Sequence, residues 1–225
     1  MKLILAVDTT NEFGSIALTR RDELVEEVLL HAPDGFGSIL FDCIKRMLER
    51  HGVELEEIDL YAAASGPGSF TGVRIGLACI KGLAEAMGKS AIAVSNLAAL
   101  AEYGSTDRRA TVIDARRGQI YGALYGPDGE ALIPESVLRF PDFMASLPEA
   151  PIEFLATDFE PFRAALAGTR FEQARITAVP RAQAAAIARI AARRLASGQV
   201  EDPSRLDANY VRRSDAELLW SDRST

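Results

Sequence analysis

Residues 65–76 have the sequence Ser65-Gly66-Pro67-Gly68-Ser69-Phe70-Thr71-Gly72-Val73-Arg74-Ile75-Gly76. A small apolar segment predicts a strand directly before this glycine-rich stretch, and apolar periodicity predicts a helix that begins within it. Glycines at such a junction allow positive φ and close approach of another group, and the N–H groups at a helix start are a natural site for an anion. The stretch is neither a Walker A loop nor a G-x-G-x-x-G motif, because no Lys follows Gly72 and Thr71 replaces the third glycine. A tight turn with close helix packing is the alternative.

The N-terminal half predicts strands and helices in alternation around this stretch. Residues 3–8 are a continuous apolar run that ends in Asp8, which is typical of a buried central strand. Apolar residues from Ile39 to Leu48 recur at intervals of three and four, which predicts an amphipathic helix. In order, we expect strands at 3–8, 14–19 and 24–30, a helix from Ile39 to near Gly52, a strand at 59–65, a helix at 71–87, a strand at 90–94, and a helix capped by Ser95 that reaches Tyr103.

The second half of the chain repeats this order of elements. We expect strands at 110–114 and 119–125, a turn at 126–129, a further strand, a helix at 142–147, a strand at 152–157, a helix at 161–167 and an alanine-rich helix at 181–197. A constant shift pairs Asp8 with Asp114 and Ala17 with Ala123 without a gap, although so few identities also fit a chance similarity. We therefore predict an α/β protein with two related lobes, residues 1–105 and 106–225.

Composition limits the classes of function. The chain has 225 residues, 48% of them hydrophobic, with a formal net charge of −7 and a pI near 5.0. Proteins that bind nucleic acid on their own usually have a basic excess, which this chain lacks. No apolar segment approaches the roughly 18 residues of a membrane span, and the apolar run near the N-terminus is too short for a signal peptide. We expect a soluble cytoplasmic protein without a membrane segment, in which Cys43 and Cys79 are free thiols.

Polar residues after the first strand are candidates for contacts to a nucleotide or a phosphate. An acid beside hydroxyl groups, as in Asp8-Thr9-Thr10, can orient a magnesium ion or a phosphate, and an Asx or ST turn is the alternative. Arg116 and Arg117 occupy the matching turn of the second half, either as contacts to phosphate or carboxylate or as exposed turn residues. The full set of candidate nucleotide or phosphate contacts is Asp8, Thr9, Thr10, Gly66, Gly68, Ser69, Thr71 and Arg74.

Two glycines of the predicted helix at 71–87 share one of its faces. Gly72 and Gly76 are four residues apart, and Ile80 and Leu83 continue the same face. Each glycine inside a helix costs up to about 1 kcal/mol relative to alanine, so close packing should offset this cost. The face can pack inside the chain or against another subunit.

The glycine-rich stretch and three further segments resemble the TsaB (YeaZ) family. These are Leu3-Ile4-Leu5-Ala6-Val7-Asp8-Thr9-Thr10, Ile113-Asp114-Ala115-Arg116-Arg117-Gly118-Gln119-Ile120-Tyr121 and Tyr210-Val211-Arg212, which together span most of the chain. The resemblance implies the actin-like ATPase fold, also called ASKHA or ribonuclease H-like. In that fold two related lobes each have a mixed sheet with flanking helices.

The resemblance also implies a role. The family is a non-catalytic partner of TsaD, which transfers a threonylcarbamoyl group to the adenosine beside the anticodon of tRNAs that read codons starting with A. TsaE joins the pair, tRNA is bound only through the complex, and the chain alone is expected to form a homodimer. TsaD carries a metal-binding H-x-x-x-H motif, which this chain lacks because its only histidines are His31 and His51. We therefore expect no catalytic residue, metal or cofactor here, while ATP or ADP with Mg²⁺ has a place in the complex.

The pairing surface of the family lies on the first two helices of the N-terminal lobe, here about 38–50 and 71–87. The partner-binding residues implied are Ile39, Leu40, Cys43, Met47, Gly72, Gly76, Ile80 and Leu83. The loop at 31–38 departs from the family's usual pattern, in which a His precedes the first interface helix. We therefore expect partner affinity or partner choice to differ from that of the family.

A second function remains open from the sequence alone. An independent actin-fold ATPase or small-molecule kinase would use Asp8 and the glycine-rich stretch on a nucleotide. It would bind and hydrolyse Mg-ATP without a partner, although 225 residues are few for a kinase with a full nucleotide cleft.

Overall fold

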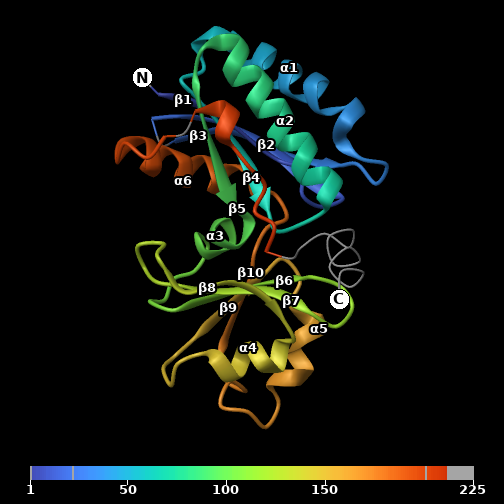
Figure 1. Cartoon of the computed structure of the whole chain (residues 1–225), viewed down its shortest axis with the longest axis vertical. Helices are drawn as coiled ribbons and strands as arrows, with labels where there is room; N and C mark the ends of the chain where they lie inside the picture. The colour runs from blue at the N-terminus through green and yellow to red at the C-terminus, as the bar shows by residue number, and fades with distance from the viewer. Residues whose placement is uncertain (1, 22, 201, 212–225) are drawn as a thin grey trace, which may run out of the picture.

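The computed structural model describes residues 2–21, 23–200 and 202–211, which form two α/β lobes, one above the other in Figure 1. Each lobe is built on a sheet of five strands. The first sheet has β3 (Glu23–His31), β2 (Phe13–Arg20), β1 (Leu3–Asp8), β4 (Leu60–Gly66) and β5 (Ser90–Ser95), in this spatial order. The second has β8 (Ala131–Leu138), β7 (Ile120–Tyr125), β6 (Arg109–Asp114), β9 (Glu153–Ala156) and β10 (Arg175–Ala178).

The two sheets share one topology. The central strand β1 runs antiparallel to β2 and parallel to β4, and β6 runs antiparallel to β7 and parallel to β9. The outer strands repeat this relation, since β3 and β8 are antiparallel to their neighbours and β5 and β10 are parallel to theirs. The predicted α/β class with two related lobes, each with a mixed sheet, is confirmed.

The two halves differ in the length of their first hairpin. Asp8 lies opposite Ser15, seven residues further on, whereas the equivalent acid of β6 lies opposite Ile120, only six residues further on. The ungapped equivalence therefore holds between β1 and β6 and is wrong by one residue in the next strand. Ala17 corresponds to the residue before Ala123, because the second turn is tighter.

Helices cover both faces of the first sheet. The helices are α1 (Leu40–His51), α2 (Phe70–Met87), α3 (Asn96–Ala101), α4 (Phe140–Ser146), α5 (Glu160–Arg163) and α6 (Ala184–Ala196), with 3₁₀ turns at 36–38, 55–57, 164–166 and 203–205. Helices α1 and α2 lie side by side over one face, and α6 lies on the opposite face, as Figure 1 shows. The first sheet is therefore the middle of a three-layer lobe.

Helix α6 joins the first lobe although it follows the second sheet in the chain. It packs against β1, β2, β4 and β5. Small side chains on both surfaces, such as Ala184 and Ala188 on the helix and Ala6 and Ala62 on the sheet, bring the backbones close together. The strands of the first sheet end at Ser95 and those of the second begin at Arg109, and α6, which follows the second sheet in the chain, supplies one layer of the first lobe.

The second lobe has an aromatic core. Phe140, Phe154, Phe159 and Phe171 meet with ring centroids 5.4–5.9 Å apart, mostly edge to face. Such arrangements are favourable beyond the area they bury. Helix α3 lies between the lobes, where its apolar residues pack against β6 and β7.

Most predicted elements are confirmed within one to three residues at their ends. Ser95 caps α3 as predicted, because its Oγ accepts hydrogen bonds from the N–H groups of Leu97 and Ala98 at 3.1 and 3.4 Å. Strand β10 has no counterpart among the predictions, since it is short and carries no clear alternation. None of the helices in the described part of the chain has the length and apolar character needed to cross a membrane.

Candidate functional site

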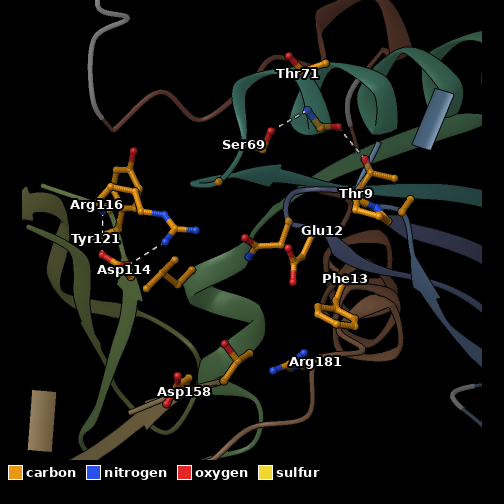
Figure 2. A pocket seen from close by; sticks show the side chains of 18 of the residues that line it. Thr9, Glu12, Phe13, Ser69, Thr71, Asp114, Arg116, Tyr121, Asp158 and Arg181 are labelled. Carbon is orange, nitrogen blue, oxygen red and sulfur yellow. Dashed lines mark hydrogen bonds and ion pairs between the residues drawn. The ribbon is translucent and has the colours of Figure 1, made fainter. Parts of the chain in front are cut away.

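A cleft of about 640 Å³ lies between the two lobes. Figure 2 shows Thr9, Ser69 and Thr71 on one wall and Asp114, Arg116 and Tyr121 on the other, with Glu12 and Arg181 between them. The first wall comes from the turn after β1 and the start of α2, and the second from the equivalent turn after β6. The repeated topology therefore places two strand-end turns face to face, which is where open α/β sheets bind ligands.

Three N–H groups of the glycine-rich stretch are engaged inside the chain. The Gly66 N–H donates to Asn96 Oδ1 at 3.0 Å, the Ser69 N–H donates to the Thr10 carbonyl at 2.7 Å, and the Gly72 N–H donates to Ser69 Oγ at 3.3 Å. Ser69 thus caps α2, as residues of this type commonly do. A phosphate bound through these three N–H groups would have to displace their partners.

The glycine face of α2 packs inside the chain. A Cβ on Gly76 would lie 2.6 Å from Thr9 Oγ1, and one on Gly72 would collide with the Thr9 carbonyl oxygen. Thr9 Oγ1 also donates a hydrogen bond of 2.7 Å to the Gly72 carbonyl. The two glycines therefore let the helix rest on the end of β1, which is the close packing that the sequence left as an alternative.

Asp8 belongs to a buried polar network. Its Oδ1 accepts hydrogen bonds from the N–H and the hydroxyl of Thr10 at 2.9 and 2.7 Å, and its Oδ2 faces Asn96 Nδ2 at 3.4 Å. Asn96 Nδ2 also donates to Thr10 Oγ1 at 2.8 Å. Burial raises the pKa of Asp8 above its ordinary value, while the hydrogen bonds from Thr10 and Asn96 oppose this shift. The network joins β1 and α3, and through Asn96 also the glycine-rich stretch, and Asp8 is not part of the cleft wall.

Asn96 was missed by sequence reasoning. It follows the predicted cap Ser95 on a helix whose other described residues are apolar and mostly buried. A lone amide on such a helix is a usable signal, because a buried polar group needs partners.

The turn after β6, which forms the second wall of the cleft, has two arginines at positive φ, of which Arg116 lines the cleft. Arg116 and Arg117 have φ of 64° and 56°, a conformation that is unfavourable for side chains other than glycine, Asn or Asp. The Arg116 N–H donates to Asp114 Oδ1 at 2.8 Å, and its guanidinium lies 3.7 Å from Asp114 Oδ2. Strain of this kind is often kept at functional sites.

Charge in the cleft is mixed. The carboxylates Glu12, Asp114 and Asp158 line it together with the guanidiniums of Arg116 and Arg181. The cleft therefore has no excess of positive charge to attract a polyphosphate. The sequence did not point to Glu12, Asp158 or Arg181, because only the fold brings the three together.

Arg181 stacks on an aromatic ring at the cleft. Its guanidinium lies 4.2 Å from the ring centroid of Phe13, and His31 stacks on Phe13 at 4.4 Å. The loop that begins at His31 is thus connected to the cleft, and Pro33 and Phe36 of this loop also line it.

The candidate nucleotide or phosphate contacts separate into two groups. Thr9, Gly68, Ser69 and Thr71 line the cleft. The remaining four, Asp8, Thr10, Gly66 and Arg74, do not. Arg74 lies instead on the exposed side of α2 beside Tyr210.

The candidate partner-binding residues are mostly internal. Leu40, Met47, Gly72, Gly76 and Ile80 are buried, and Ile39, Cys43 and Leu83 are partly buried against the same core. Pairing through α1 and α2 stays a prediction, but the side chains free to carry it are their exposed neighbours. Within the described residues, no group of three His, Cys, Asp or Glu side chains is placed to hold a metal ion.

Two five-stranded mixed sheets of one topology, joined around a cleft, define a protein of the actin-like ATPase fold. A Bacillus subtilis (strain 168) protein named tRNA threonylcarbamoyladenosine biosynthesis protein TsaB is 32% identical over 162 residues, which cover 69% of this chain and 71% of that protein. The chain belongs to the TsaB family.

Further comparisons agree with this membership. The protein of the same name from Escherichia coli (strain K12) is 36% identical over 129 residues, covering 56% of this chain and 55% of that one. The solved structure of YeaZ from Pseudomonas aeruginosa superposes with a TM-score of 0.79 at 26% identity, over 93% of this chain and 100% of that chain. A family model described as TsaD, tRNA N6-adenosine threonylcarbamoyltransferase, matches residues 32–212, so the chain also resembles that enzyme.

Proposed function

We propose that this chain is the non-catalytic subunit that binds TsaD and supports threonylcarbamoyl transfer to tRNA. The target is the adenosine beside the anticodon of tRNAs that read codons starting with A. TsaE joins the pair in the cytoplasm, and tRNA is held through the complex because the net charge of −7 is unfavourable for direct binding. The names of the relatives and the resemblance to TsaD support this role.

The observation that carries the proposal is the α2 outer face, defined as Phe70, Arg74, Ala78, Gly82 and Ala86. These residues recur every fourth position, so they share one side of the helix, and all five are exposed. A Cβ on Gly82 would meet nothing within 4 Å. The glycine costs up to about 1 kcal/mol in the helix, and no contact in the described chain offsets that cost. Close packing of a partner helix against this face would offset the cost of the glycine.

Helix α1 can extend the same surface. It lies beside α2, and Phe41 on its outer side is 57% exposed. Exposed aromatic side chains are enriched at protein interfaces. The same surface would serve a homodimer when TsaD is absent.

The geometry gives little support to an independent ATPase or kinase. Asp8 is buried and hydrogen-bonded through both oxygens, and three N–H groups of the glycine-rich stretch donate to Asn96, Thr10 and Ser69. Catalytic carboxylates need access to substrate or metal, which Asp8 lacks in this conformation. These contacts favour a docking role over turnover.

The test is complex formation with purified TsaD, followed by threonylcarbamoylation of tRNA with and without this chain. We expect Gly82→Leu to weaken TsaD binding at least tenfold while the protein stays folded, because its side chain enters open space. Gly82→Ala should still bind, and Ala145→Leu, a matched change on the exposed side of α4, should bind as the wild type does.

Two results would overturn the proposal. One is unchanged binding of TsaD by folded Gly82→Leu. The other is steady Mg-ATP hydrolysis by the isolated chain with no stimulation of TsaD. Gly76→Leu is unsuitable for this test because its side chain would collide with Thr9 inside the fold.

A further inference from the structure

Three large side chains form a cluster at the N-terminal end of α2. The Arg74 guanidinium lies 3.7 Å from the ring centroid of Phe70, and its Nε donates a hydrogen bond of 3.0 Å to the Tyr210 hydroxyl. The rings of Phe70 and Tyr210 are 5.6 Å apart. Phe70 and Tyr210 nevertheless remain 46% and 45% exposed. The three side chains therefore hold one another in place without being covered.

Tyr210 reaches this position because the C-terminal segment 206–211 is fixed to the first lobe. Leu206 is buried in the core beneath α2, and the Asn209 N–H donates to the Ser65 carbonyl at 2.8 Å. Asn209 Nδ2 also donates to Glu135 Oε2 of the second lobe at 2.5 Å. The segment that carries Tyr210 is thus attached to both lobes, which lowers the conformational entropy that a partner would have to remove on binding.

The cluster lies at the N-terminal end of the α2 outer face, where the large side chains of that face are. Phe70 and Arg74 are the first two members of that face, and the small residues Ala78, Gly82 and Ala86 follow at the same spacing. The face therefore has bulky aromatic and cationic groups at one end and a shallow surface of small residues beyond them. A partner helix that lies along the whole length of this face meets the cluster at one end.

Charge indicates what that end should carry. Arg74 uses Nε on Tyr210 and forms no ion pair with any acid in the part of the chain that the structure describes. Its remaining N–H donors are suited to a carboxylate, which a guanidinium binds in a fixed planar geometry. Exposed aromatic and arginine side chains at such points commonly contribute most of the binding energy.

We propose that Phe70, Arg74 and Tyr210 are the anchor of the TsaD-binding surface, where Arg74 pairs with a carboxylate of TsaD and the two rings receive an apolar side chain. This inference rests on the proposed function. TsaD is the occupant because it is the partner in the proposed function, and the TsaD family model matches residues 32–212, a range that includes α2. The C-terminal segment becomes part of the interface, and Arg74 is a partner contact and not a phosphate contact.

The test compares TsaD affinity among single variants by calorimetry. Tyr210→Ala and Arg74→Gln should each weaken binding by at least tenfold, with thermal unfolding close to that of the wild type because both sites are at the surface. Tyr210→Phe separates the two parts of the anchor, since it keeps the ring and loses the hydrogen bond, and should cost less than Tyr210→Ala. Arg74→Gln should also make the affinity less sensitive to salt.

Leu132→Ala is the matched control, because Leu132 is 46% exposed on β8 of the second lobe. It should leave TsaD affinity unchanged. If wild-type chain binds TsaD and Tyr210→Ala and Arg74→Gln bind equally well, the anchor is refuted while the proposed function stands. If the wild-type chain does not bind TsaD at all, both proposals fail.

Discussion

Replacing Gly72 with alanine should destabilise the protein although alanine is the better helix former. The added Cβ would lie 3.1 Å from the Thr9 carbonyl carbon and would overlap the carbonyl oxygen. Backbone atoms cannot rotate away as a side chain can, so α2 must move off the end of β1. Overpacking of this kind costs about 1–3 kcal/mol, and the helix propensity of alanine returns at most about 1 kcal/mol. We place the net loss near 2 kcal/mol because the obstacle is backbone.

The measurement is thermal and urea unfolding followed by circular dichroism. A loss of about 2 kcal/mol lowers the midpoint of a protein of this size by roughly 4–8 °C. Gly82→Ala in the same helix is the control. Its Cβ meets open space, so it should raise the midpoint by about 2–4 °C.

The two substitutions should change the free energy of unfolding in opposite directions. If Gly72→Ala were neutral or stabilising, α2 would not rest on Thr9 as described, and the internal role of the glycine face would be wrong. If both variants lost stability equally, the cost would come from the helix and not from the contact with β1.

Two further predictions concern buried polar contacts. Glu153 is fully buried on β9; burial raises its pKa, but hydrogen bonds from Thr177, Ser105 and Thr106 outweigh this and lower the pKa below its ordinary value of 4.5. The ionised carboxylate therefore stabilises the fold fully above pH 4.5, and this stabilisation is lost as the pH falls through the lowered pKa. Glu153→Gln should lower the free energy of unfolding by about 1.5–3 kcal/mol at pH 7. It should also make the stability measured by urea unfolding depend less on pH in the acid range, and an unchanged dependence would contradict this explanation. Ser15 Oγ accepts the N–H groups of Gln183 and Ala184 at 2.9 Å and so caps α6 from another part of the chain. Ser15→Ala should lose about 1–2 kcal/mol in the same assay, and exchange of the amide hydrogens in the first turn of α6 should speed up; slow exchange there would show that the cap is dispensable.

Local sequence signals predicted the elements well because they are short-range. The apolar run before Asp8 and the three- and four-residue periodicity of α1 need no distant contact to be recognised. Strand β10 was missed because four residues are too few for alternation to show. Helix α5 is equally short, because it ends at Arg163 and a 3₁₀ turn follows it directly.

The candidate site was predicted only in part. Thr9, Ser69 and Thr71 were found because they follow strands and begin a helix, and these positions converge at one end of a sheet. Arg181 and Asp158 were not found, since nothing near them in sequence marks a cleft. Whether these two residues line a cleft depends on how the two lobes are placed relative to each other, and this is a long-range property.

The sequence alone determined the family, the two-lobed α/β fold and the glycine-rich junction, because these depend on local pattern and repeated order. Tertiary structure decided which way each residue faces. It turned Gly72 and Gly76 inward onto Thr9, placed Arg74 outside against Tyr210, and returned α6 to the first sheet. The sequence of a helix contains the residues of all its faces, and only the packing of the helix determines which face is buried and which is left for a partner.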